Sequence, residues 1–211
     1  LDHVVHHTPL RTSATTNQRT EKNVYFKMEN QQKTGAFKFR GASYKLMRLT
    51  EEELGCGVIT ASAGNHAQGL ALAAHKLGVK ATIYMAEATP EAKVEATRGY
   101  GAQVVLTGES FQEAYEAALE HQKKCGATFV HPFDDYDIMA GQGTIALEML
   151  EQDLDFSARP EVGEVLELFE GDGAFGFEAD VEHDHVVADL EHRARGRRRR
   201  TPSCVPAADR W

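Results

Sequence analysis

Short β-branched or apolar runs alternate with segments of helical periodicity along most of the chain, and this alternation limits the fold more than any other feature. Strands separated by single helices pair in parallel and carry those helices on both faces of the sheet. The sequence therefore predicts an α/β fold with open parallel sheets, in which ligands bind beyond the carboxyl ends of the strands. We expect strands over 24–28, 58–60, 81–85, 103–106 and 128–130, and helices over 38–48, 65–77 and 138–150.

Two helix starts carry a local signature. Thr50 with Glu53, and Ser110 with Glu113, have the spacing of a capping box, in which a hydroxyl and a carboxylate three residues later satisfy free backbone N–H groups. After Ser110, apolar residues recur at the spacing of one helix face. We therefore expect helices to begin directly after Thr50 and Ser110.

Composition excludes several classes of function. The 211-residue chain carries a formal net charge of −9, which disfavours nucleic acid as its main partner. No apolar stretch reaches the length of about 18 residues that a membrane span needs. The His-rich start lacks the apolar segment of a secretory signal, so we expect a cytoplasmic protein with no membrane partner. The cysteines lack the spacing of a metal site, and we expect no metal.

One lysine and one turn carry the chemistry. Lys38 lies in the segment Thr34-Gly35-Ala36-Phe37-Lys38-Phe39-Arg40-Gly41-Ala42, a small, apolar setting where an amine loses its proton at low cost and attacks a carbonyl. The turn Ser62-Ala63-Gly64-Asn65 opens a helix beyond an expected strand and offers N–H groups to an anion. Together they describe an aldehyde cofactor on a lysine beside a pocket for a substrate carboxylate, which is the chemistry of pyridoxal phosphate (PLP). The alternative for Lys38 is an exposed lysine on an amphipathic helix.

These two segments, in this order and spacing, resemble the threonine/serine dehydratase (threonine ammonia-lyase) family of tryptophan-synthase-β-like, fold type II PLP enzymes. The likeness begins at His7-Thr8-Pro9-Leu10, includes Ala140-Gly141-Gln142-Gly143-Thr144 and fades near Phe156.

The resemblance implies a two-domain fold with a truncated larger domain. Residues 1–54 would begin the larger PLP domain and carry Lys38, residues 55–137 would form a smaller α/β domain, and residues 138–156 would return to the larger one. The family's glycine run, which wraps the PLP phosphate, would follow and is not found in this sequence.

The resemblance also implies roles for individual residues. Lys38 would link the cofactor aldehyde and later remove the α-proton of the substrate, and Phe37 would pack near the cofactor ring. Asn65 would hydrogen-bond the 3-hydroxyl of PLP and also cap its helix. Gln142 would contact substrate, or would only begin a helix beside flexible glycines. The implied substrate-binding residues are Ser62, Ala63, Gly64, Asn65, His66 and Gln142.

The implied activity is the deamination of L-threonine or L-serine, a small hydroxy amino acid, to a 2-oxo acid and ammonia, with a homo-oligomer left open. Serine racemase and 3-hydroxyaspartate ammonia-lyase are alternatives. Similar racemases carry a second serine where this chain has Ala63, and an alanine cannot move a proton on the opposite face. Ala63 therefore favours a dehydratase. A further alternative is a catalytically dead fragment, because a phosphate without its glycine cradle is poorly held.

Residues 157–211 differ in composition from the rest of the chain. They contain no Lys, Asn, Gln, Ile, Met or Tyr, whereas residues 1–156 use all six. The missing residues have AT-rich codons, so we interpret this segment as an out-of-frame translation of a GC-rich gene. The alternative is a natural disordered tail. In both cases we expect most of the segment to be disordered.

Overall fold

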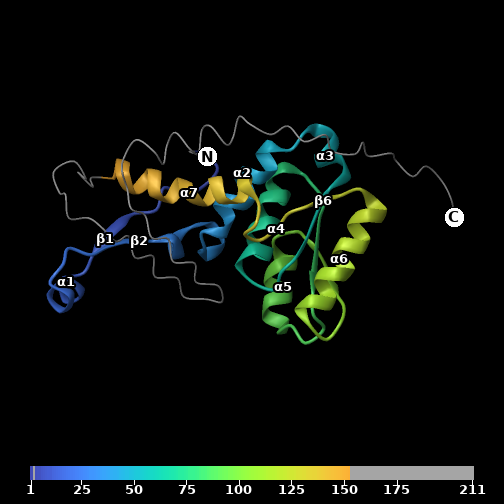
Figure 1. Ribbon diagram of the computed structural model, residues 1–211, viewed down its shortest axis with the longest axis horizontal. Helices are drawn as coiled ribbons and strands as arrows, with labels where there is room; N and C mark the ends of the chain where they lie inside the picture. The colour runs from blue at the N-terminus through green and yellow to red at the C-terminus, as the bar shows by residue number, and fades with distance from the viewer. Residues whose placement is uncertain (2, 153–211) are drawn as a thin grey trace.

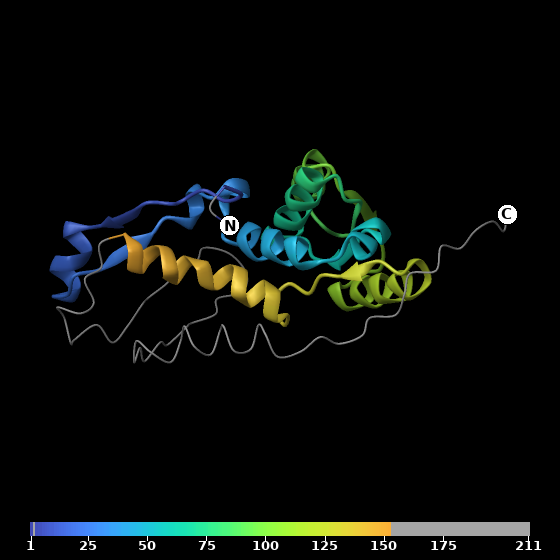
Figure 2. The same ribbon diagram turned by 90° about the horizontal axis from the view of Figure 1, so that it is seen from above.

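The computed structural model describes residue 1 and residues 3–152 of the chain. A parallel sheet with its helices lies at one end of the molecule and a two-stranded arm lies at the other (Figure 1). Two helices connect these ends and pack against each other, α2 (Lys38–Arg48) and α7 (Tyr136–Glu151). Figure 2 shows the length of α7 running beside the arm and α2.

Four parallel strands form the sheet in the order β5-β4-β3-β6. Because they are parallel, their carboxyl ends share one edge, and the loops that follow β3 and β6 lie next to each other there. The expected strands are confirmed, with β3 one residue longer and β6 one residue shorter than predicted. Their bounds are β3 Val58–Ala61, β4 Ala81–Met85, β5 Gln103–Leu106 and β6 Thr128–Phe129.

Side chains of the central strands alternate between two apolar cores, as the pleat of a strand requires. Val58 and Ile83 face the core built with α4 (Asn65–Leu77) and α5 (Glu91–Gly99). Ile59 and Tyr84 face the core built with α6 (Phe111–Cys125). Helices therefore cover both faces of the sheet, and the predicted α/β fold class is confirmed.

Helix α2 is the centre of the packing. It contacts α4 on one side and α7 on the other, and its apolar residues Phe39, Ala42 and Leu46 are completely buried. α2 and α4 have the predicted bounds. α7 begins two residues earlier than predicted, because Asp135 Oδ1 accepts the N–H groups of Asp137 at 2.9 Å and Ile138 at 3.2 Å and so caps the helix.

The arm is the part that sequence patterns describe least. Only the strand over 24–28 is predicted there. It forms as β2 and pairs in an antiparallel manner with β1, which lies on the other side of a short helix, α1. Two 3₁₀ turns then lead into α2. The bounds are β1 Leu10–Thr12, α1 Ala14–Thr20, β2 Tyr25–Lys27, η1 Glu29–Gln31 and η2 Lys33–Gly35.

One predicted capping box forms completely and the other forms by half. At α3 (Glu51–Cys56), Thr50 Oγ1 accepts the N–H of Glu53 and the Glu53 carboxylate accepts the N–H of Thr50. At α6, Ser110 Oγ accepts the N–H of Glu113 at 3.3 Å. The Glu113 carboxylate, however, accepts the N–H of Glu109 rather than that of Ser110.

None of the helices in the described part of the chain has the length and apolar character needed to cross a membrane. The expectations for residues 157–211 lie outside the described residues, and the proposed domain boundaries stay predictions.

Candidate cofactor and substrate site

Lys38 is the first residue of α2, at the carboxyl-end edge of the sheet. Its side chain is half-buried, and its Nζ donates a hydrogen bond to the carbonyl oxygen of Pro132 at 3.0 Å. Pro132 follows β6, so this bond brings the amine to the edge where ligands bind in parallel sheets. Burial lowers the pKa of Lys38, because desolvation disfavours the charged form. The predicted sheltered amine with a lowered pKa therefore has a physical basis, and the alternative of an exposed lysine does not describe this side chain.

Glycine at position 69 sets the distance between α4 and the start of α2. A Cβ at Gly69 would lie 3.0 Å from the backbone nitrogen of Phe39 and 3.1 Å from the carbonyl carbon of Lys38. Backbone therefore packs on backbone at this point. Since Gly69 lies about one helical turn after Asn65, this contact keeps the start of α4 close to the start of α2.

The loop Ser62–Gly64 follows β3 and leads into α4. The Ser62 N–H donates to the Tyr84 carbonyl at 3.1 Å, and Ser62 Oγ accepts the N–H of Gly64 at 3.3 Å. Gly64 is the N-cap residue and, as a glycine, has no side chain with which to cap the helix. The first N–H groups of α4 have no partner within their own helix, so they offer a site for a carboxylate.

Asn65 is the exposed first residue of α4 and not its cap. The expectation that its side chain caps the helix is therefore wrong, because Gly64 takes the non-helical position. An exposed amide at this edge is available to a ligand. Its predicted bond to the PLP 3-hydroxyl stays a prediction.

His66 has its side chain in the protein interior. It is 3% exposed, and its Nε2 lies 3.2 Å from the carbonyl oxygen of Val130. Because a carbonyl only accepts, Nε2 carries the ring proton, and Nδ1 is buried without a hydrogen-bond partner among the described residues. Burial lowers the pKa of His66 to about 4; the bond to Val130 opposes this shift, and the charge of Lys38 adds to it. The buried ring is directed into the protein, and a contact of the His66 backbone with substrate stays a prediction.

Gln142 lies where α2 and α7 cross. Its Oε1 accepts the N–H of Gly41 at 3.1 Å, and its Nε2 is buried without a partner among the described residues. The two helices approach so closely here that a Cβ at Gly141 would lie 2.6 Å from the Cα of Gly41. Gln142 therefore contacts the helix that carries Lys38, and its contact with substrate stays a prediction.

Two further predicted residues flank these groups. The Phe37 ring centroid lies 4.9 Å from the Lys38 Nζ, which is cation–π distance. Ala63 is half-buried and packs against the main apolar core. Its methyl group carries no proton to transfer. Within the described residues, no cluster of three or more His, Cys, Asp or Glu side chains has the arrangement of a metal site.

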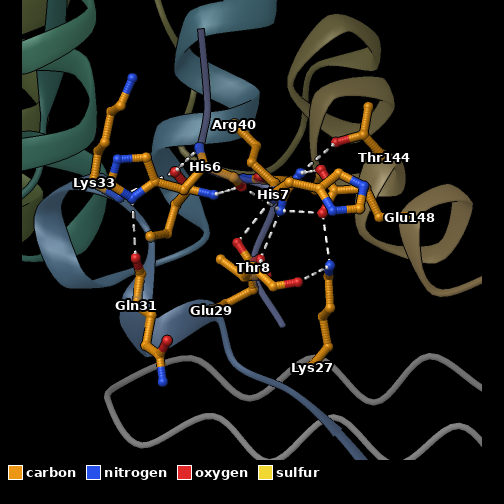
Figure 3. Close-up of polar contacts among 12 residues, drawn as sticks. His6, His7, Thr8, Lys27, Glu29, Gln31, Lys33, Arg40, Thr144 and Glu148 are labelled. Atoms are coloured by element: carbon orange, nitrogen blue, oxygen red, sulfur yellow. Dashed lines mark hydrogen bonds and ion pairs between the residues drawn. The ribbon is translucent and has the colours of Figure 1, made fainter. Parts of the chain in front are cut away.

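Four buried charged side chains that no sequence pattern indicates form a group, here called the charge cluster (Figure 3). Arg40, which is 0% exposed, binds Glu29 at 2.7 and 2.8 Å and Glu148 at 2.6 and 2.9 Å, each with two nitrogens. Glu148 also accepts a hydrogen bond from the Lys27 Nζ at 2.6 Å. The cluster joins β2, η1, α2 and α7, and it consists of Lys27, Glu29, Arg40 and Glu148.

Pairing governs the protonation of the charge cluster. Burial alone would lower the pKa of Arg40, but the hydrogen bonds and charges of Glu29 and Glu148 outweigh it and raise that pKa above its ordinary value. Burial would raise the pKa of Glu148, but Arg40 and Lys27 hold it below its ordinary value. The positive and the negative side chains thus stabilise each other in their charged forms, and the charge cluster links the arm and α7 to the first turn of α2.

The family of pyridoxal-phosphate dependent enzymes matches residues 1–162 of this chain. The chain therefore belongs to the pyridoxal-phosphate dependent enzymes. The residues present fit that cofactor, because Lys38 offers a partly desolvated amine and the adjacent loop offers anion-binding N–H groups. The predicted membership of the PLP enzymes and the predicted cofactor are confirmed.

Curated relatives of this chain include enzymes named for L-threonine. An L-threonine ammonia-lyase of Thermotoga maritima is 56% identical over 151 residues, which are 72% of this chain and 38% of the relative. A catabolic L-threonine dehydratase of Staphylococcus aureus is 53% identical over 148 residues, which are 70% of this chain and 43% of that relative. The chain thus spans less than half the length of these relatives.

Solved structures give the same result for the fold. The processed form of threonine deaminase isoform 2 from Solanum lycopersicum has a TM-score of 0.70 and 45% identity, over 72% of this chain and 44% of that one. Maize serine racemase has a TM-score of 0.69 and 38% identity, over 72% and 46% of the two chains. The likeness confirms the predicted fold of type II PLP enzymes.

Proposed function

We propose that this chain supplies the cofactor lysine and the substrate-carboxylate loop of an enzyme that deaminates L-threonine or L-serine to a 2-oxo acid and ammonia. The observation that carries the proposal is the half-buried Lys38 amine, whose pKa burial lowers, at the same sheet edge as the loop Ser62–Gly64. The names of the relatives support L-threonine as the substrate. A lysine amine beside a loop that can bind a carboxylate agrees with the chemistry of an ammonia-lyase.

PLP, when bound, supplies an electron sink for the substrate α-carbon. Lys38 would hold the cofactor through its side-chain amine, and the same amine would serve as the base for the substrate α-proton. The N–H groups at the start of α4 hold the substrate carboxylate, helped by the positive end of the helix dipole. Asn65 would orient the cofactor ring through its amide, and Phe37 would shield the side of Lys38 from water.

Ala63 separates this activity from racemisation. Removal of a β-hydroxyl group needs one base near the α-carbon, whereas racemisation needs a proton donor on each face of it. Ala63 offers none on its face, which supports a dehydratase although a serine racemase is among the structural relatives. We further infer a cytoplasmic enzyme with a small hydroxy amino acid as partner, open to homo-oligomer formation, and the net charge of −9 supports the absence of nucleic acid as a partner.

The test is a labelling experiment on the full 211-residue chain. PLP is added, the lysine link is reduced with borohydride, and the modified peptide is identified by mass spectrometry. We expect the label at Lys38 and its loss in Lys38→Ala, while Lys45→Ala, a lysine on the same helix, keeps it. Label spread evenly over the lysines would overturn the proposal. Products from L-threonine, L-serine and 3-hydroxyaspartate then distinguish lyase, racemase and a fragment that binds PLP without turnover.

A further inference from the structure

The turn that follows β6 is held by a histidine side chain. His131 Nδ1 accepts the N–H of Phe133 at 3.3 Å and the N–H of Asp134 at 2.8 Å. An acceptor at Nδ1 needs a lone pair, so the ring proton is on Nε2. The bonding pattern matches that of Asp135, whose Oδ1 accepts the N–H groups two and three residues later. His131 therefore acts as the acceptor of a local turn.

The Pro132–Phe133 peptide group lies between His131 and Lys38. Its N–H end is bonded to the His131 ring, and its C=O end accepts the Lys38 Nζ at 3.0 Å. A trans peptide is rigid and planar, with its N–H and C=O directed to opposite sides. Holding the N–H end therefore fixes the direction of the C=O end.

The His131 ring is itself held by aromatic neighbours. The Phe133 ring packs edge-to-face against it at a centroid distance of 4.5 Å. Tyr115 of α6 and Phe129 of β6 lie at 6.4 Å. These contacts limit the orientation of the ring, so Nδ1 stays directed at the turn.

We propose that His131 is a positioning residue for Lys38, because it orients the Pro132 carbonyl that receives the free Lys38 amine. The inference rests on the proposed function of Lys38. A lysine side chain has several rotatable bonds, and a fixed acceptor selects one arrangement from them. A neutral amine that donates one N–H to a carbonyl keeps its lone pair for attack on an aldehyde. Hydrogen bonding also increases the electron density on its nitrogen.

The test compares the rate at which PLP becomes linked to Lys38 in three forms of the full chain. His131→Phe keeps an aromatic ring against Tyr115 and Phe129 but removes the acceptor. His131→Asn restores an acceptor suited to the same turn. The link is trapped with borohydride at successive times, and the Lys38 peptide is quantified against the peptide of Lys80, an exposed lysine, in the same sample.

We expect His131→Phe to slow labelling of Lys38 relative to Lys80 by about fivefold, the equivalent of one hydrogen bond. His131→Asn should stay within about twofold of the unchanged chain by the same measure. Urea unfolding of each variant shows whether folding is preserved, and the rescue by asparagine separates an acceptor role from a general effect on stability.

Equal rates in all three forms would overturn the inference, and so would an asparagine variant as slow as the phenylalanine variant. A failure of the proposed function has a different signature, because Lys38 would then go unlabelled in the unchanged chain. If His131→Phe does not fold, the asparagine variant decides alone, since a slow but folded His131→Asn contradicts the inference.

Discussion

Lys38 and Arg40 lie two positions apart at the start of α2, yet their surroundings are opposite. Arg40 is completely buried between two carboxylates, which raise its pKa against the effect of burial. Lys38 is half-buried, forms no ion pair with any described residue, and has a pKa that burial lowers. Counter-charges keep one cation charged and fixed for structure. Desolvation without a counter-charge disfavours the charged form of the other, which the proposed role of Lys38 requires.

The largest effect should come from removing the paired cation. Arg40→Met leaves Glu29 buried without its cation and Glu148 with Lys27 alone. Breaking a buried ion pair by removing one partner costs about 3–5 kcal/mol, because the remaining charge is desolvated without compensation. Urea unfolding of the full chain, followed by far-UV circular dichroism, measures this loss.

Arg98→Met is the matched control. Arg98 has an equally short contact, 2.6 Å to Glu95, but its side chain is 43% exposed. Exposed pairs contribute about 0–1 kcal/mol, so this variant should unfold at nearly the urea concentration of the unchanged chain. Equal losses for Arg40→Met and Arg98→Met would show that burial of the charge cluster does not decide its effect.

As the pH falls, protonation of His66 should lower the free energy of unfolding before protonation of Glu148 in the charge cluster does. The folded protein holds His66 at a pKa of about 4, whereas an unfolded histidine titrates near 6.5. The unfolded chain therefore binds the extra proton first, and the free energy of unfolding falls as the pH drops from about 6.5 to about 4, by about 3 kcal/mol in total. Glu148 affects stability at a lower pH. Its paired carboxylate contributes stability above its unfolded pKa of about 4.5, and this contribution is lost as the pH falls further.

Urea unfolding at intervals between pH 7 and pH 4 measures this slope. In His66→Gln the slope should be reduced, because an amide does not titrate in this range. His75→Gln changes an exposed histidine on the same helix and should keep the original slope. A His66→Gln variant with an unchanged slope would contradict the assignment of the acid sensitivity to this buried ring.

Much of the fold and site follows from local patterns. The alternation of strands and helices, the complete capping box at Thr50, and the position of Lys38 in the first turn of α2 depend on residues close in sequence. The edge location of the loop Ser62–Gly64 also follows, since a parallel sheet puts such loops at its carboxyl ends. Short-range chemistry is sufficient for these features.

Features that depend on distant partners were not predictable in the same way. Arg40 lies in a recognisable segment, but its carboxylate partners are 11 and 108 positions away, and no local signal identifies them. His66 was expected only as part of the carboxylate loop. Its ring is buried because Val130, 64 positions away, offers the carbonyl it bonds. Long-range packing decides which polar side chains become buried.

The close contact between α2 and α7 should have a smaller effect on the free energy of unfolding. In Gly141→Ala, the new Cβ would lie 2.6 Å from the Gly41 Cα and 2.8 Å from the Arg40 carbonyl oxygen, so α7 must move away from α2. We expect a loss of about 1–3 kcal/mol in the free energy of unfolding. Gly143→Ala is the control on the same helix, with no atom within 4 Å of the new Cβ. It should gain about 0.5–1 kcal/mol, because alanine favours a helix interior over glycine.

The smallest effect should have opposite signs for two lysines of α2. Lys38→Met removes an amine whose charged form burial disfavours, so it should raise the free energy of unfolding at pH 7 by about 0.5 kcal/mol or less, since the side chain is still partly solvated. Lys45→Met should lower it by about 1 kcal/mol, because Lys45 lies 2.8 Å from Asp135 and 3.1 Å from Asp137 and these raise its pKa despite burial. Chemical unfolding of the two variants beside the unchanged chain measures the difference. Losses of equal size would mean that Lys38 is as well paired as Lys45, and the contrast between the reactive amine and the structural cations would not hold.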